Sequence, residues 1–249
     1  NKSLIINYGL ANQGAEIIYG RLRDKKFRFP VIVNIAKTND ASIKGDNSVE
    51  DYVEGFTKMK SASNIFAINI SCPNVGDGRS FEDPVLLEKL LNSLNKKRKG
   101  VKLLLKISPD IERKNLDKII WLAEKYNIDG FIISNLTKNR NGLLKENNVN
   151  SCGGISGPVL AKKSNKLIAY VFRKTRGRFV IIGCGGIFSA KDAYEKIKCG
   201  ASLVELITSM IYQGPGIIKN INSELVEFLR RDGYNNIKEA VGASVRQNG

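Results

Sequence analysis

The chain has 249 residues, 42% of which are hydrophobic, and this is enough apolar sequence for one packed core. It has no histidine, which excludes the commonest general base and the commonest metal ligand, and its four cysteines show no zinc-ligand or disulfide spacing, so we expect reduced thiols. The formal net charge is +16, but the basic residues are scattered among acidic ones without interleaved aromatic residues, which predicts solvated helix faces rather than a nucleic-acid surface.

Six apolar stretches rich in β-branched residues predict strands that are buried on both faces, as in a parallel sheet. In chain order they cover residues 29–36, 66–71, 101–108, 130–136, 179–186 and 203–208. Helical patterns alternate with these strands, over residues 48–62, 83–97, 115–127, 189–200 and 216–233. The long interval between the fourth and fifth strands is expected to contain an inserted loop, residues 137–157. The alternation predicts an α/β chain with right-handed crossovers.

Three of the expected helices carry start signals. Ser48 followed by Asp51 resembles a capping box at the start of the first helix. Asp83 is the expected N-cap of the second helix, with Pro84 at the first helical position. Ser189 is expected to cap the helix that follows the fifth strand.

Two architectures fit six such strands. One is an open, doubly wound sheet, and the other is a (β/α)₈ TIM barrel whose first two βα units precede Asn1. The sequence contains no linker or change of composition, so we expect residues 1–249 to form a single domain.

Each predicted strand begins apolar and acquires polar or glycine residues at its carboxyl end. The series consists of Asn34, Asn69, Lys106, Ser134 with Asn135, Gly185 with Gly186, and Thr208. Because active sites of α/β barrels are built from the carboxyl ends of several strands, this pattern predicts a functional site there.

Lys106 stands out within this series because it lies in the apolar stretch LLLKIS. A buried lysine is costly unless it meets an anion or a polarised oxygen, and the alternative is an edge lysine that reaches water. Two glycine clusters, at residues 152–157 and 183–186, would let backbone amides approach a phosphate, although each cluster alone also fits an ordinary tight turn. No zinc or calcium ligand spacing occurs.

The motifs, taken in order, resemble those of the dihydroorotate dehydrogenase family, whose members are FMN-dependent (β/α)₈ barrels. The resemblance covers nearly the whole chain. It is carried by INYGLANQGA (6–15), VNIAK (33–37), NISCPN (69–74), LLLKISPD (103–110), IISNLT (132–137), GGISG (153–157), IIGCGGIFSAKDAYEKIKCGASLVELIT (181–208) and GPG (214–216). It therefore favours the barrel over the open sheet.

The resemblance implies oxidation of dihydroorotate to orotate in pyrimidine (UMP) biosynthesis, with hydride transfer to FMN. Cys72 would be the catalytic base, and Lys106 would stabilise the reduced flavin. FMN would be bound by Asn34, Asn69, Lys106, Ser134, Gly157, Gly185, Gly186, Ile207 and Thr208. Dihydroorotate or orotate would be held by Asn7, Tyr8, Gly9, Asn69, Asn74 and Asn135.

The chain departs from the family pattern in two ways. The first two βα units of the family, with their AAGFDK flavin motif, have no counterpart, so the expected barrel is incomplete at its N-terminus. The GGISG loop and the tail GYNNIKEAVGA (233–243) resemble the quinone-reducing class 2 enzymes, whereas a cysteine base at position 72 is typical of class 1. We expect quinone as electron acceptor, with fumarate or NAD as alternatives.

No run of eighteen apolar residues and no signal peptide is present, so we expect a cytoplasmic protein, with class 2 similarity implying peripheral contact with the inner membrane. Two other functions remain open. One is an FMN barrel similar to tRNA dihydrouridine synthases. The positive charge suits this function, but the sequence shows no C-terminal helical RNA-binding domain of the kind expected for it. The other is a non-catalytic barrel remnant that binds a phosphate ligand.

Overall fold

The computed structural model describes residues 2–71, 80–141 and 153–246. Two compact units are present. The N-terminal unit comprises Tyr8–Ile107 and Ile111–Gly130, and the C-terminal unit comprises Asn1–Asn7, Ser108–Asp110 and Phe131–Gly249. The expectation of a single domain over residues 1–249 stays a prediction.

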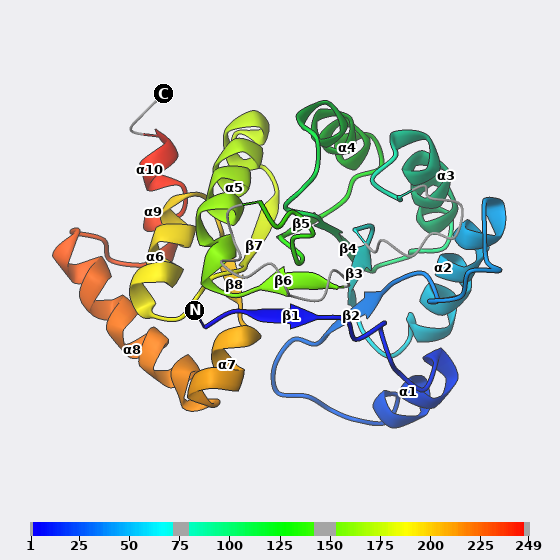
Figure 1. Cartoon of the computed structure of the whole chain (residues 1–249), viewed down its shortest axis with the longest axis horizontal. Coiled ribbons are helices and arrows are strands. Elements are labelled where there is room, and N and C mark those ends of the chain that lie inside the picture. The colour runs from blue at the N-terminus through cyan, green and yellow to red at the C-terminus, as the bar shows by residue number, and fades with distance from the viewer. Residues whose placement is uncertain (1, 72–79, 142–152, 247–249) are drawn as a thin grey trace. The chain divides into compact units, whose positions relative to one another are not determined.

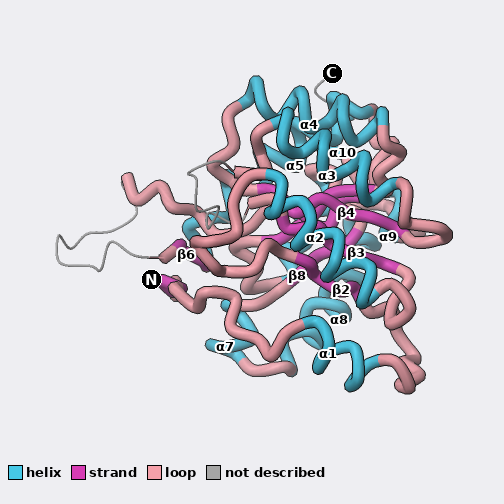
Figure 2. The backbone as a smooth tube through the Cα atoms, turned by 90° about the vertical axis from the view of Figure 1, so that its right-hand side faces the viewer, coloured by secondary structure: helices cyan, strands magenta, loops and turns pink. Residues whose placement is uncertain are grey.

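The N-terminal unit is built from three βα repeats. Its elements are α1 (Ala15–Leu22), β2 (Ile32–Ile35), α2 (Asp46–Met59), β3 (Ile65–Asn69), α3 (Pro84–Asn95), β4 (Lys102–Ile107) and α4 (Arg113–Lys125). β2, β3 and β4 are parallel neighbours in that order, and α2, α3 and α4 lie along one side of them (Figures 1 and 2). Phe56 on α2 packs edge-on against Phe66 on β3, with ring centroids 5.0 Å apart, and both are fully buried.

The C-terminal unit continues the repeat. Its elements are β1 (Leu4–Ile6), β5 (Gly130–Ile133), β6 (Gly154–Ser156), a 3₁₀ turn (Pro158–Leu160), α5 (Ala161–Thr175), β7 (Val180–Cys184), α6 (Ala190–Lys198), β8 (Leu203–Glu205), α7 (Thr208–Gln213), α8 (Gly216–Arg231), α9 (Ile237–Ala240) and α10 (Ala243–Arg246). β5, β7 and β8 follow one another in the sheet, β1 pairs antiparallel with β6, and α8 packs along α6 (Figure 1).

All six predicted strands are confirmed within the described residues, with shorter bounds. The start signals give a mixed result. Asp83 caps α3 by accepting hydrogen bonds from two amides, and Ser189 caps α6 by accepting one from Asp192. The capping box at Ser48 is wrong, because α2 begins two residues earlier. The Ser48 hydroxyl is buried and donates to the carbonyl of Ile43.

The interval between the fourth and fifth predicted strands is not only a loop. It contains β6, the 3₁₀ turn and the fifteen-residue helix α5. No side chain caps the first turn of α5, since the chain enters it through the 3₁₀ turn, and the usual sequence signal of a helix start is therefore absent. Among the described residues, no helix is both long enough and apolar enough to cross a membrane.

Candidate active site

Asn69 and Lys106 are adjacent at the carboxyl ends of β3 and β4. They are register partners in this parallel pair, and only 6% of Asn69 and 8% of Lys106 is exposed. Neighbouring strands lie about 4.8 Å apart, so an amide and an ammonium group share one sheet edge. Lys106 is thus a buried lysine rather than an edge lysine that reaches water.

Asn34 on β2 shares a face of the sheet with these two residues. It is the register partner of Ala67, which precedes Asn69 by two positions on β3. Because side chains two positions apart on a strand point to the same face, the side chains of Asn34, Asn69 and Lys106 project from one side of the three strands. Asn34 is exposed, whereas the other two are buried.

The end of β3 is held by two hydroxyl groups. Tyr52 on α2 is 1% exposed, and its hydroxyl donates to the carbonyl of Asn69 at 2.7 Å. The hydroxyl of Ser71 donates to the side-chain oxygen of Asn69 at 2.8 Å. The predicted base Cys72 and the predicted substrate ligand Asn74 lie outside the described residues, immediately after this anchored strand end.

The predicted substrate segment is divided between the two units: Asn7 belongs to the C-terminal unit, and Tyr8 and Gly9 belong to the N-terminal unit. Tyr8 is 72% exposed. The carbonyl of Gly9 accepts a hydrogen bond from the side-chain amide of Asn39, which follows β2, at 3.2 Å. The turn at Gly9 is therefore attached to the loop that follows the predicted flavin strand β2.

Ser134 follows β5 and has a buried hydroxyl group. The residue is 1% exposed, its amide donates to the carbonyl of Cys184 at 3.0 Å, and its Oγ has no hydrogen-bond partner among the described residues. A buried hydroxyl almost always has a partner, so this one is suited to a ligand. The assignment of Ser134 to the cofactor stays a prediction.

The turn after β7 requires glycine. Gly185 and Gly186 have φ angles of 103° and 77°, which side chains rarely adopt. A Cβ at Gly186 would lie 2.7 Å from the backbone nitrogen of Ala161, the first residue of α5. Backbone of the β7 turn and of the α5 start can approach so closely only without a side chain at position 186.

The remaining predicted cofactor residues lie around β6 and the start of α7. The Oγ atoms of Thr208 and Ser156 are 2.6 Å apart, and Thr208 is 5% exposed. Gly157 has a φ of 122°, and a Cβ there would lie 2.8 Å from the carbonyl oxygen of Lys2. Ile207 precedes α7 and is half exposed. Sequence reasoning named these positions but missed β6 and its partner strand β1.

Asn135 directly follows Ser134 and begins the loop after β5. Its side-chain oxygen accepts a hydrogen bond from the amide of Leu136 at 2.9 Å, and the residue is half-buried. It is therefore part of the same strand end as Ser134, with its side chain turned back on the loop backbone.

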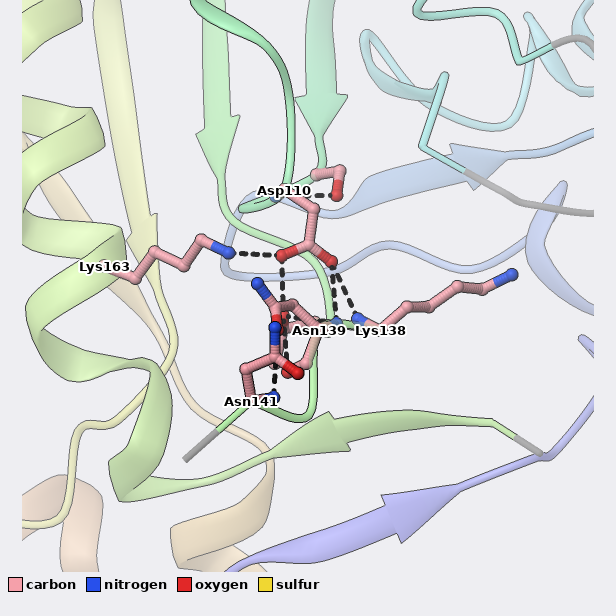
Figure 3. Close-up of polar contacts among 7 residues, drawn as sticks. Asp110, Lys138, Asn139, Asn141 and Lys163 are labelled. Atoms are coloured by element: carbon pink, nitrogen blue, oxygen red, sulfur yellow. Dashed lines mark hydrogen bonds and ion pairs between the residues drawn. The ribbon is translucent and has the colours of Figure 1, made fainter. Parts of the chain in front are cut away.

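Asp110, which sequence reasoning did not single out, anchors that loop (Figure 3). Its carboxylate accepts hydrogen bonds from the Thr137 hydroxyl at 2.6 Å and the Lys138 amide at 2.7 Å, and it forms an ion pair with Lys163 on α5. The side chain of Lys138 points away from the carboxylate (Figure 3). Asp110 thus joins the segment after β4, the loop after β5 and helix α5.

The charge on Asp110 is stabilised by these contacts. Burial would raise the pKa of this carboxyl, but the hydrogen bonds from Lys163, Thr137 and the Lys138 amide outweigh it and leave the pKa below its usual value. The carboxylate therefore stays ionised in the folded protein. The sequence signal was slight, namely an aspartate four residues after Lys106 and a threonine three residues after Ser134.

Among the described residues, no three histidine, cysteine, aspartate or glutamate side chains are grouped so that they could hold a metal ion. The predicted site residues provide amide and hydroxyl groups, the buried ammonium group of Lys106 on β4 and the glycine turns. Such a set suits an organic ligand with polar ring edges and a phosphate.

Comparison with known proteins gives a consistent result. The sequence pattern of the family described as "Dihydroorotate dehydrogenase" matches residues 1–229. A dihydroorotate dehydrogenase (quinone) of Trichodesmium erythraeum is 37% identical over 254 residues, covering 97% of this chain and 67% of the relative. Another, of Christiangramia forsetii, is 40% identical over 232 residues, covering 90% of this chain and 66% of the relative.

A solved structure of similar fold is the ligand-free DHODH of Eimeria tenella. It matches with a TM-score of 0.88 and 28% identity, covering 98% of this chain and 74% of that chain. The barrel expectation is thereby confirmed over the open doubly wound sheet, and this chain contains part of the barrel. The chain spans about two thirds of the length of the relatives that it matches in sequence.

Proposed function

Because this chain belongs to the dihydroorotate dehydrogenase family, we propose that its protein oxidises dihydroorotate to orotate with FMN as cofactor. The observation that carries the proposal is the row of polar groups at the carboxyl ends of the strands. Lys106 is buried beside Asn69, and the buried Ser134 hydroxyl has no partner among the residues that the structure describes. A dihydrouridine synthase and a phosphate-binding remnant are less favoured, because the family match covers residues 1–229.

The residues present fit FMN. FMN would be bound by Asn34, Asn69, Lys106, Ser134, Gly157, Gly185, Gly186, Ile207 and Thr208. Glycine turns of this kind can present backbone amides to a phosphate, and the Ser134 hydroxyl could satisfy one polar edge of a ring. When bound, FMN supplies the acceptor for the hydride that leaves C6 of dihydroorotate.

The chain's own residues would divide the remaining work. Cys72, as thiolate, would take the proton from C5, and Lys106 would place a fixed positive charge beside the site where negative charge develops. Asn7, Tyr8, Gly9, Asn69, Asn74 and Asn135 would orient the planar substrate by hydrogen bonds. A lysine on a buried strand suits the stabilisation of this negative charge, because its ammonium group does not have to be reoriented during the reaction.

The electron acceptor that we propose is quinone, with peripheral contact at the inner membrane where quinones dissolve. The names of the relatives from Trichodesmium erythraeum and Christiangramia forsetii, which include quinone, support this acceptor. Anaerobically reduced protein mixed with a water-soluble quinone, fumarate or NAD would identify the acceptor by the rate of flavin reoxidation. Fast reoxidation by fumarate or NAD alone would contradict the proposal.

The activity is tested by flavin absorbance and by anaerobic stopped-flow bleaching with dihydroorotate in the full-length protein. Lys106→Ala should slow bleaching or weaken FMN binding at least about tenfold, since it removes a buried charged group at the site. Lys102→Ala is the matched control, because Lys102 lies on the same strand but is exposed at its other end. A protein without flavin, or a Lys106→Ala variant that bleaches at the wild-type rate, would contradict the proposal.

A further inference from the structure

Lys196 on α6 is a buried cation to which the reaction assigns no role. It is 1% exposed, and its alkyl chain runs beneath β7, where a Cβ at Gly183 would lie 2.5 Å from Lys196 Cδ. The strand therefore has glycine at the point where the lysine passes. Burying an ammonium group costs free energy unless its N–H groups find hydrogen-bond acceptors.

The ammonium group of Lys196 donates to two neutral side chains on α5. The distances are 2.7 Å to Oδ1 of Asn165 and 3.1 Å to Oγ of Ser164. Desolvation by burial lowers the pKa of Lys196 to about 8, against small opposing effects of Cys184, Cys199 and the acidic residues of α6. A link between two helices alone would not require a charged group, because neutral side chains can form it without this cost.

Ser164 transmits the contact from Lys196 to the ends of two strands. Its Oγ lies 2.7 Å from the carbonyl oxygen of Cys184 on β7 and 3.2 Å from that of Ile133 on β5. Lysine donates and never accepts, so the serine oxygen must accept from Lys196 and direct its single proton to a carbonyl. The shorter distance favours the carbonyl of Cys184.

The same carbonyl of Cys184 also accepts the amide proton of Ser134, at 3.0 Å. One oxygen thus binds the strand end that carries the Ser134 hydroxyl, and it belongs to the residue before Gly185. Lys196, Ser164, the Cys184 carbonyl and the Ser134 amide form a continuous chain of hydrogen bonds. Its last member, Ser134, is a residue that we assign to the cofactor, and Cys184 directly precedes another, Gly185.

We propose that Lys196 is a positioning residue of the cofactor site, which acts through Ser164 to fix the Ser134 amide and the Gly185 turn. The inference rests on the proposed binding of FMN. Side chains that support the ligand-contacting residues by hydrogen bonds hold those residues in the positions that tight binding needs.

The test compares Lys196→Met and Ser164→Ala in the full-length protein, measured by FMN dissociation constant and by deuterium exchange at the Ser134 amide without FMN. Lys191→Met is the control for charge, because Lys191 is exposed on the same helix. Thr175→Val is the control for stability, because its buried hydroxyl bonds only carbonyls within α5. It should lower the melting temperature without changing FMN binding.

Lys196→Met and Ser164→Ala should each raise the FMN dissociation constant about tenfold. The double variant should have a dissociation constant no higher than that of the single variant that binds FMN less tightly, as expected for groups in one network. Exchange at the Ser134 amide should become faster in both. Folded variants with wild-type FMN affinity and wild-type exchange would overturn the proposal, and Ser164→Ala decides alone if Lys196→Met does not fold. If the wild-type protein bound no FMN, the proposed function would fail, while amide exchange would still test the positioning by Lys196.

Discussion

The two units bring polar groups to the ends of their strands in different ways. In the N-terminal unit, the functional groups are side chains of the strands themselves, as with Asn69 and Lys106 in direct register. In the C-terminal unit, the important groups are the Ser134 hydroxyl and the glycine turn after β7, and they depend on a carboxylate and an ammonium group behind them. Strand side chains thus carry the polar groups of the first unit, whereas the residues that follow the strands carry those of the second.

The largest effect is expected from removing the predicted base, which directly follows the β3 end. Cys72→Ala should retain FMN but lose flavin reduction by dihydroorotate by roughly 10²–10⁴-fold, the usual weight of a general base. Flavin bleaching in a stopped-flow instrument measures this step independently of the acceptor. Cys199→Ala, which removes a half-buried thiol at the end of α6, should bleach as wild type. A Cys72→Ala variant that reduced its flavin at the wild-type rate would show that Cys72 is not the base.

The second expectation concerns the glycine turn of the C-terminal unit. Gly186→Ala should lower the free energy of unfolding by about 3 kcal/mol, because a positive φ and a collision with the α5 backbone add together. Gly214→Ala isolates the backbone cost, since Gly214 has a φ of 72° and open space around its Cβ. It should lose only about 1 kcal/mol. Chemical denaturation measures both, and equal losses would show that close packing at Gly186 is unimportant.

A smaller loss is expected when the Asp110 anchor is weakened. Asp110→Asn keeps the shape but removes the charge that Lys163 and Thr137 contact, and should cost about 2 kcal/mol of unfolding free energy. Because the folded pKa of Asp110 lies below its ordinary value, this contribution is present above that value and is lost as pH falls through the folded pKa. Glu224→Gln, at an exposed position on α8, is the control. The difference should vanish in acid, and a difference that persisted there would contradict an ionic anchor.

The smallest expected effect is a pH dependence of stability from Lys196. Its pKa of about 8 in the folded protein lies below the ordinary 10.5, so the unfolded chain binds more protons between these values. Stability should therefore rise with pH from about 8 to 10.5, by on the order of 1 kcal/mol per pH unit in the difference between wild type and Lys196→Met. Denaturation of both proteins across this range measures the difference. A difference that stayed constant would mean that Lys196 is not a desolvated cation.

Sequence signals correctly predicted helix starts where the deciding interactions lie within the first turn of the helix. Asp83 with Pro84 marks the start of α3 because both act through the first helical turn itself. Ser48 with Asp51 failed because a tertiary contact competes: Asp51 accepts hydrogen bonds from the Thr38 amide and hydroxyl instead of completing a capping box. Helix α5 was missed since it begins from a 3₁₀ turn without a polar cap.

The sequence shows the polar residues at the strand ends, but it does not show the groups that support them. Polar residues at the carboxyl ends of apolar strands are visible in the sequence, because a buried strand has few other reasons to carry Asn69 or Lys106. Lys196 in KIKCG looks like any lysine of a solvated helix, and only the packing of α6 against β7 and α5 shows that it is buried.

The sequence by itself determined the alternation of strands and helices, the polar strand ends and the family resemblance, since each depends on residues that are near one another in the chain. The tertiary structure decided which partners the charged groups meet. Asp110 meets Thr137 and Lys163, and Lys196 meets Ser164, across separations of 27, 53 and 32 residues. Hydrogen bonds and desolvation depend on distances in space, which neither composition nor periodicity encodes.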